Sequence, residues 1–181
     1  MDSDLSSIME SPTELEMQHD LKYFPPLSAL PIKDQIDEAY YVSTDGINYK
    51  PAIHWCFLGE IVQHSFHTRL RILVRDRAGK LVPIAFHTAD LGLSLMRAGE
   101  VKVGNTVVVL YAEQHAFSES TVGICQTTLH NIKVLPGSLD DLKQLSQRLR
   151  MYMEASQGTP MCHNCNKKSA SLLRCGKIVR L

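Results

Sequence analysis

One stretch decides the fold of this chain: Arg69-Leu-Arg-Ile-Leu-Val-Arg75-Asp-Arg-Ala-Gly-Lys80-Leu-Val-Pro-Ile-Ala-Phe-His87. Its first seven residues alternate between basic and apolar side chains, with Leu73 as the exception. Successive side chains of a strand point to opposite faces of the sheet. We therefore predict a strand with Leu70, Ile72 and Val74 on a buried face. The other face, which is partly exposed to solvent, carries Arg69, Arg71, Leu73 and Arg75.

The rest of this stretch predicts the second half of a β-hairpin. Asp76–Lys80 is a short connection in which Gly79 can adopt a positive φ, and Leu81–His87 is the return strand. Pro83 has no backbone N–H to donate to a neighbouring strand. We therefore expect Pro83 to lie at a sheet edge or at a bulge.

Short β-rich runs separated by turn residues extend from both sides of this hairpin. The segment after it, Thr88–Gly99, predicts a short helix that Thr88 or Asp90 can cap and Gly99 can end. The predicted elements around the hairpin are a strand at Trp55–Val62, the helix at Thr88–Gly99, a strand at Thr106–Ala112, and a last strand divided between Val122–Cys125 and Asn131–Leu135.

The order strand, strand, strand, short helix, strand, strand is that of a five-stranded Greek-key barrel of the OB type. The phrase Glu100-Val-Lys-Val-Gly-Asn-Thr-Val-Val-Val-Leu110 also resembles the turn that leads from helix to fourth strand in the OB family. The predicted fold is therefore mainly β, with an OB-like barrel at its centre. A β-sandwich and an SH3-like barrel remain alternatives, because strand counts from one sequence vary by one or two.

Length and composition indicate a soluble globular chain with one main domain. Its 181 residues are 44% hydrophobic and 21% charged, and no apolar run approaches the about 18 residues that a membrane span requires. The start, Met1-Asp-Ser-Asp-Leu5, lacks the basic and apolar regions of a signal peptide. We expect an intracellular protein, cytoplasmic or nuclear, without membrane association.

Charge is distributed unevenly and marks four predicted regions. Residues 1–39 hold nine acids and two bases (−7) and predict an acidic disordered arm. Residues 40–137 hold seven acids and nine bases (+2) and contain the barrel. Residues 138–155 predict an amphipathic helix, and residues 156–181 a linker with a cysteine-rich tail. The apolar stripe of the helix, which either packs on its own domain or binds a partner, is Leu139, Leu142, Leu145, Leu149 and Tyr152.

Three of the five cysteines lie in the tail. Cys162-His-Asn-Cys165 has the spacing of a metal-binding knuckle, in which two thiolates reach one tetrahedral ion. Nine residues later, Leu173-Arg-Cys175-Gly-Lys177 begins a second such pattern. In a reducing compartment a cluster of this kind is more often a metal site than a set of disulfides. Cys56 and Cys125 lie alone in apolar stretches and are interpreted as buried hydrophobic residues.

The cysteine tail resembles the opening of a MYND-type zinc finger. The resemblance assigns Cys162, Cys165 and Cys175 to the first three of eight zinc ligands, and Ile178 stands where the family has its fourth. It implies zinc as the cofactor and a protein partner, such as a proline-containing peptide. Because the ligand set is incomplete, we expect the tail to bind metal weakly. His163 could serve as an additional ligand in a makeshift site.

Three classes of function follow from these patterns. The first is a non-enzymatic zinc-finger protein that mediates protein–protein interaction. The second is a single-stranded nucleic-acid-binding OB module, for which a hairpin face lined by basic residues is the candidate site. An enzyme is the third and weakest, because none of the eight histidines has a hydrolase, zinc-protease or phosphate-loop spacing. The basic residues, for which a merely solvated face is the alternative, are Arg69, Arg71, Arg75, Arg77 and Lys80.

Overall fold

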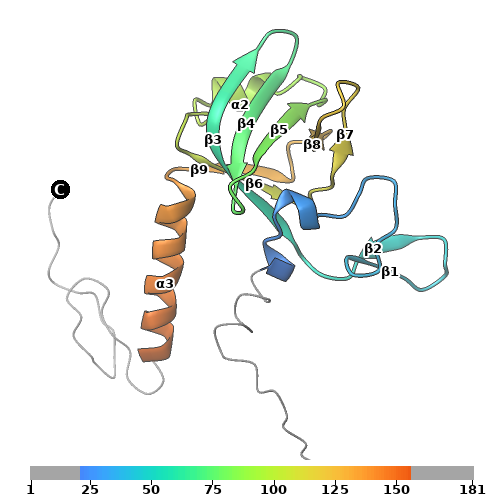
Figure 1. Ribbon diagram of the computed structural model, residues 1–181, viewed down its shortest axis with the longest axis horizontal. Coiled ribbons are helices and arrows are strands. Elements are labelled where there is room, and N and C mark those ends of the chain that lie inside the picture. The colour runs from blue at the N-terminus through green and yellow to red at the C-terminus, as the bar shows by residue number, and fades with distance from the viewer. Residues whose placement is uncertain (1–20, 156–181) are drawn as a thin grey trace, which may run out of the picture. The chain divides into compact units, whose positions relative to one another are not determined.

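The computed structural model describes the backbone of residues 21–155 and the side chains of residues 21–148. The chain divides into two compact units, with the boundary between Leu139 and Asp140. The described part of the first unit is mainly β (Figure 1). It has a 3-10 turn, η1 (Leu27–Ala29), and a short helix, α2 (Leu93–Arg97), and residues 21–23 are also helical. Its strands are β1 (Tyr41–Ser43), β2 (Tyr49–Pro51), β3 (Cys56–Phe66), β4 (Leu70–Asp76), β5 (Leu81–Phe86), β6 (Thr106–Leu110), β7 (His115–Ala116), β8 (Val122–Gln126) and β9 (Ile132–Leu135).

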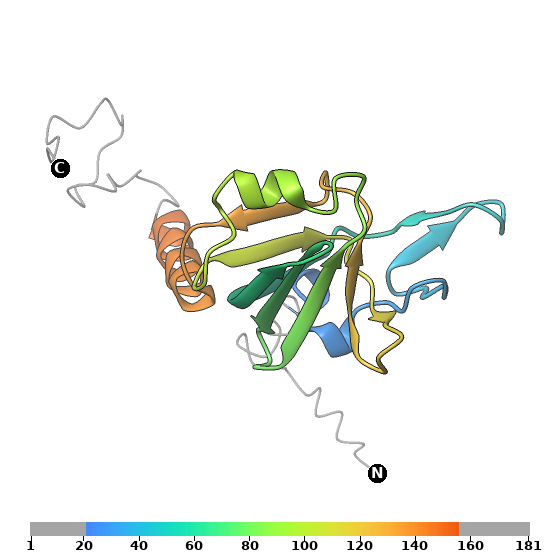
Figure 2. The same ribbon diagram turned by 90° about the horizontal axis from the view of Figure 1, so that it is seen from above.

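Seven of these strands form one sheet in the order β7-β8-β5-β4-β3-β6-β9. β3, β4 and β5 are a meander of antiparallel hairpins, and β6 pairs antiparallel with the other side of β3. β8 runs parallel to β5, whereas β9 runs antiparallel to β6. Since only residues 127–131 separate β8 from β9, the chain itself joins the two sides of the sheet, whose strands curve around one interior (Figure 2).

The sequence predicts five strands and a divided last strand, and the structure contains that division. The main sheet counts seven strands because the last one is split into β8 and β9 and because the loop after β6 adds the two-residue strand β7. Pro83 lies in the part of β5 that precedes its pairing with β8, which begins at Ile84. Because no strand within residues 21–155 pairs with that side of β5 at Pro83, the missing N–H of this proline costs no hydrogen bond between strands.

Alternation along β4 is as predicted. Leu70, Ile72 and Val74 are buried, whereas Arg71 and Arg75 are exposed. Gly79 in the β4–β5 turn has φ +82°, which glycine adopts without strain. The apolar face of the hairpin joins a core whose largest fully buried side chains are Trp55, Phe57, Phe86, Leu27, Ile61, Leu70, Ile72 and Ile84.

Helix α2 is shorter than predicted. It spans Leu93–Arg97, because Leu91 and Gly92 both have positive φ and cannot continue a right-handed helix. The N-cap residue is Gly92 rather than the predicted Thr88 or Asp90, although the Asp90 carboxylate still accepts a hydrogen bond from the Ser94 N–H at 2.9 Å. Gly99, with φ +70°, follows the helix as predicted.

Residues 21–39 differ from the disordered arm that the composition predicts. Leu27 and Leu30 are buried in the core, and the Leu27 N–H donates to the buried Asp76 carboxylate at 3.1 Å. The Tyr40 O–H donates to the Ala29 carbonyl at 2.7 Å. The polar composition of residues 1–39 is a poor guide to this segment, because the burial of Leu27 and Leu30 anchors residues 21–39 to the core.

The β1–β2 hairpin is a second element that the sequence analysis missed. It forms a separate two-stranded sheet. Asp45 organises its turn by accepting hydrogen bonds from the backbone N–H groups of Ile47 and Asn48. These bonds, with that from the Asn48 side chain, hold the pKa of Asp45 well below its usual range.

Helix α3 spans Leu139–Ala155, and its residues from Asp140 on are the described part of the second unit. Asp140 and Asp141 lie in its first turn, where the helix dipole favours acids. Of the predicted apolar stripe, Leu142 is half-buried and Leu145 is exposed. No helix within residues 21–155 is long and apolar enough to cross a membrane.

Closure of the sheet depends on Gly123, and Gly123→Ala tests that dependence. A Cβ at this position would lie 2.7 Å from Pro83 Cγ and would also collide with the Pro83 carbonyl oxygen, which is backbone and cannot move aside. We expect a loss of about 2 to 3 kcal/mol in the free energy of unfolding, measured by urea denaturation. Val122→Ala is the control: this side chain is 42% exposed, and its truncation should cost less than about 1 kcal/mol. Equal losses in the two variants would show that the close approach at Gly123 does not matter.

Candidate functional site

A cavity of about 520 Å³ lies on the outer face of the β4–β5 hairpin. Three segments form its walls: the end of β3 with the turn into β4, the start of the hairpin, and the loop between β6 and β8. Its lining is rich in cationic, aromatic and hydroxyl groups. The residues are Ser65, His67, Thr68, Arg69, Arg71, His87, His115, Phe117, Ser118 and Glu119.

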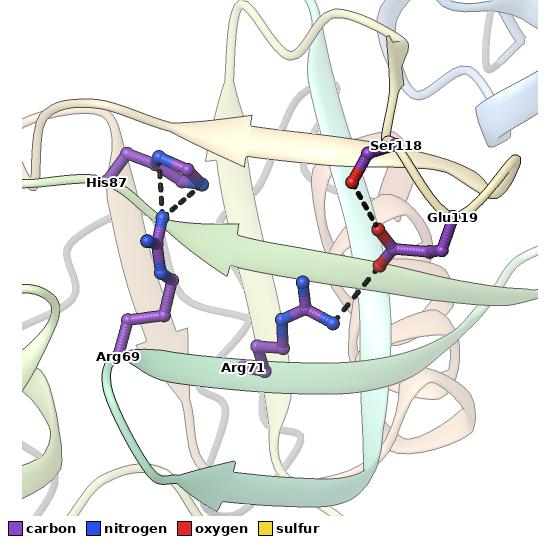
Figure 3. Close-up of polar contacts among 5 residues, drawn as sticks. All are labelled: Arg69, Arg71, His87, Ser118 and Glu119. Carbon is purple, nitrogen blue, oxygen red and sulfur yellow. Dashed lines mark hydrogen bonds and ion pairs between the residues drawn. The ribbon is translucent and has the colours of Figure 1, made fainter.

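Arg69 and His87 form one side of this cavity (Figure 3). The Arg69 Nη1 lies 2.7 Å from His87 Nδ1 and 2.6 Å from Nε2. A neutral imidazole has one acceptor nitrogen, so one of these two contacts is a hydrogen bond. Desolvation and the neighbouring Arg69 guanidinium lower the pKa of His87, which keeps the ring neutral and able to accept.

Arg71 contacts the loop between β6 and β8 through an ion pair with Glu119. Arg71 Nη1 lies 3.1 Å from Glu119 Oε1, and Ser118 Oγ lies 3.3 Å from Glu119 Oε2 (Figure 3). The backbone N–H of Glu119 itself, and then Arg71, lower the pKa of this carboxyl. The two side chains are 54% and 43% exposed, so solvent screens the pair and it adds little to the stability of the fold. A competing anion can therefore displace Glu119 at little cost.

Phe117 adds an aromatic surface beside these cations. Its ring packs edge-on against His115, with ring centroids 4.9 Å apart. The Arg71 guanidinium carbon lies 6.0 Å from the centre of the Phe117 ring. The cavity thus combines cations that can bind phosphate with a ring on which a planar group can stack.

The structure brings together only two of the five predicted basic residues, Arg69 and Arg71. Arg75 lies further along β4, opposite Glu60 of β3, and Lys80 is in the β4–β5 turn. Arg77 donates to the Phe24 carbonyl oxygen at 2.8 Å. These three do not line the cavity.

Sequence analysis missed the other members of the site, His87, His115, Phe117 and Glu119. Three of them belong to the loop between β6 and β8, which has no periodicity to reveal which side chains point at the hairpin. Its position between the predicted fourth and fifth strands was the available signal, because OB barrels bind ligands with this loop.

The predicted zinc ligands Cys162, Cys165 and Cys175 lie outside the described residues. Cys56 is buried as predicted, and burial raises the pKa of its thiol to about 11. Cys125 is half-buried. Within residues 21–148, no group of three or more histidine, cysteine, aspartate and glutamate side chains could hold a metal ion.

Comparison with known proteins yields no family for this chain. No family model matches the sequence, and no curated protein resembles it. One similar solved structure is the S. pombe Stn1–Ten1 complex, at 17% identity and a TM-score of 0.36 over 67% of this chain and 84% of that chain. Another is Schizosaccharomyces pombe Pot1pC bound to single-stranded DNA, at 10% identity and a TM-score of 0.38 over 68% of this chain and 98% of that chain. Likeness at this level assigns no ligand to this chain.

The Arg69–His87 contact predicts a measurable pKa for His87. We expect this imidazole to titrate below its ordinary value of 6.5 when the histidine ring signals are followed by NMR. In Arg69→Gln the pKa should rise toward that value, because a neighbouring cation that disfavours the imidazolium is gone. Arg75→Gln removes a cation further along β4, outside the cavity, and is the control that should leave the His87 pKa unchanged. A His87 pKa that Arg69→Gln leaves unchanged would contradict the contact.

Proposed function

We propose that this chain is a single-stranded nucleic-acid-binding module built on an OB-type barrel, and that the cavity over the β4–β5 hairpin is its binding site. The strand pairings support the fold assignment: β3, β4 and β5 correspond to the first three barrel strands and β6 to the fourth. β8 and β9 correspond to two halves of the fifth strand, which pairs with the third in parallel and with the fourth antiparallel.

The position of the cavity is the single observation that carries the proposal. OB barrels bind oligonucleotides and oligosaccharides on the face of strands two and three, between the loop joining strands one and two and the loop joining strands four and five. In this chain these are the β4–β5 face, the turn at residues 67–69 and the segment at residues 111–121. The cavity is lined by residues from all three.

The chemistry of the lining favours a nucleic acid over a neutral sugar. Arg69 and Arg71 are exposed or half-exposed cations on adjacent outward positions, as a phosphate backbone requires. Phe117 provides a ring for one base, and stacking on an aromatic ring does not depend on base sequence. A strand bound here would replace Glu119 at Arg71 with a phosphate.

Affinity should be modest. Two arginines, one of them paired with Glu119, are few for a polyanion, and residues 40–137 carry a net charge of only +2. We therefore expect dissociation constants on the order of micromolar at low salt.

A protein-binding role for the cysteine tail stays a prediction, because residues 156–181 lie outside the described part of the chain. It is compatible with the proposed site, since the two involve different segments. Zinc and a proline-containing peptide remain the expected ligands of that tail.

Paired substitutions test the proposed site. In Arg69→Gln/Arg71→Gln, the affinity for a fluorescent single-stranded 12-mer, measured by anisotropy, should fall about tenfold or more at low salt. The slope of log K against log salt should become shallower by about 1.4, because two phosphate contacts are lost. Arg75→Gln/Lys80→Gln removes the same charge away from the cavity and should cost clearly less. Absence of binding by the unaltered protein, or equal losses in both variants, would refute the proposal.

A further inference from the structure

Three of the ten residues that line the cavity over the β4–β5 hairpin are histidines: His67, His87 and His115. They come from three different segments of the chain. His67 lies in the turn between β3 and β4, His87 follows β5, and His115 begins β7. An imidazole ordinarily takes up a proton between about pH 8 and pH 5, where arginine stays charged throughout. The charge of this cavity therefore changes with pH.

The histidines are numerous relative to the other charged residues that line the cavity, which are Arg69, Arg71 and Glu119. The formal charge of the lining is +1 when the three imidazoles are neutral and +4 when all three are protonated. Glu119 is paired with Arg71, and its pKa is lowered, so this carboxylate stays ionised where histidine titrates. The affinity for a polyanion increases with the number of cations that meet its phosphates, so protonation should strengthen binding.

The contact between Arg69 and His87 gives His87 a second effect on the site (Figure 3). Arg69 donates to a ring nitrogen of His87, and only a neutral imidazole has a nitrogen that can accept. When His87 takes up a proton, both of its ring nitrogens become donors and this hydrogen bond is lost. Protonation therefore releases the Arg69 guanidinium and places an imidazolium beside it, and both groups can then donate to a phosphate.

The surroundings of His87 oppose its protonation in the free protein. Among the residues that the structure describes, the groups whose charge acts on it are Arg69, His115, Arg71 and Lys33. Desolvation, and then these cationic groups, lower the pKa of His87 below its ordinary value of 6.5. A bound phosphate is an anion among these cations and raises the pKa of the imidazole again. His87 is therefore mostly neutral near pH 7 in the free site and gains a proton when a strand binds.

We propose that binding of a nucleic-acid strand to this cavity is coupled to proton uptake by its histidines, and that protonated His87 releases Arg69 to bind a phosphate. This proposal rests on the nucleic-acid-binding function proposed above. The sign of the coupling follows from linkage: because bound phosphate raises the pKa of His87, the affinity increases as the pH falls. The increase ends below the pKa that His87 has in the free protein. His67 and His115 add to the same response.

The oligonucleotide dT12 without a terminal phosphate tests this coupling, because neither thymine nor a phosphodiester titrates in the range in which histidine does. Its binding to the full chain is measured by anisotropy at equal, low ionic strength, with a fluorophore that does not titrate in this range. We expect the affinity to be about tenfold or more higher at about pH 5.5 than at about pH 7.5, since uptake of one proton changes it by up to tenfold per pH unit. The slope of log K against log salt should be steeper at the lower pH, by about 0.7 for each further phosphate contact.

Substitutions at His87 locate the proton. His87→Gln keeps an oxygen that can accept from Arg69 but cannot take up a proton, so the ratio of the affinities at the two pH values should fall about threefold or more. His87→Arg is positively charged at both pH values, so it should bind dT12 more tightly than the unaltered protein at the higher pH and also show a reduced ratio. His130→Gln removes an exposed histidine outside the cavity and should keep the original ratio.

The outcomes separate the coupling from the function on which it rests. The thermal midpoint of each variant at both pH values, followed by circular dichroism, establishes that it is folded. A ratio near one in the unaltered protein, or a ratio that His87→Gln leaves unchanged, overturns the coupling at His87 while leaving the proposed function in place. Failure of dT12 to bind at either pH overturns the proposed function and the coupling with it.

Discussion

The parallel pairing of Ile84–Phe86 with Ile124–Gln126 is the constraint on which the rest of the structure depends. It joins the end of the β3–β4–β5 meander to the strand that continues, through residues 127–131, into the partner of β6. Only glycine fits at position 123, where the chain passes the Pro83 carbonyl. The loop between β6 and β8 consequently crosses the outward face of the hairpin, where it places Phe117 and Glu119 beside Arg71. The same pairing aligns Gln126 with the buried Phe86.

The interactions at the cavity over the β4–β5 hairpin are weak, whereas those that hold the hairpin to the rest of the barrel are strong. This arrangement suits a binding site. Solvent screens the half-exposed Arg71–Glu119 pair, so this ion pair fixes the loop between β6 and β8 only weakly. Behind the site, Asp76 is buried and accepts from the N–H groups of Leu27 and Lys80, which ties the N-terminal segment to the hairpin turn. Charge-assisted bonds of this kind are worth more than exposed pairs. The rigid part is therefore the scaffold, and the adjustable part faces the cavity.

The elements that could be predicted from the sequence are those with a periodic pattern of side chains or a clear turn residue. The alternation at Leu70–Arg75 and the turn at Gly79 predicted the hairpin, and the break between Val122–Cys125 and Asn131–Leu135 predicted the division of the last strand. The buried position of Leu27 and the β1–β2 hairpin were not predicted, because both are stabilised by a few specific contacts and neither has a periodic sequence pattern. Of the five basic residues predicted to line the hairpin face, Arg69 and Arg71 line the cavity and the other three lie outside it, since period two assigns a face but not a position along it. Phe117 could not be found this way, because the geometry of the loop between β6 and β8 brings it beside Arg71.

One measurement addresses the central claim, that the β4–β5 face and its two flanking segments form a nucleic-acid site. Backbone amide signals of the isotopically labelled chain can be followed by NMR while an unlabelled single-stranded 12-mer is added. The account predicts that the shifted amides concentrate at residues 65–71, 87 and 115–119, the segments that line the cavity over the β4–β5 hairpin. Shifts that concentrate instead on the β1–β2 hairpin, or amides that do not move at any oligonucleotide concentration at low salt, would contradict it.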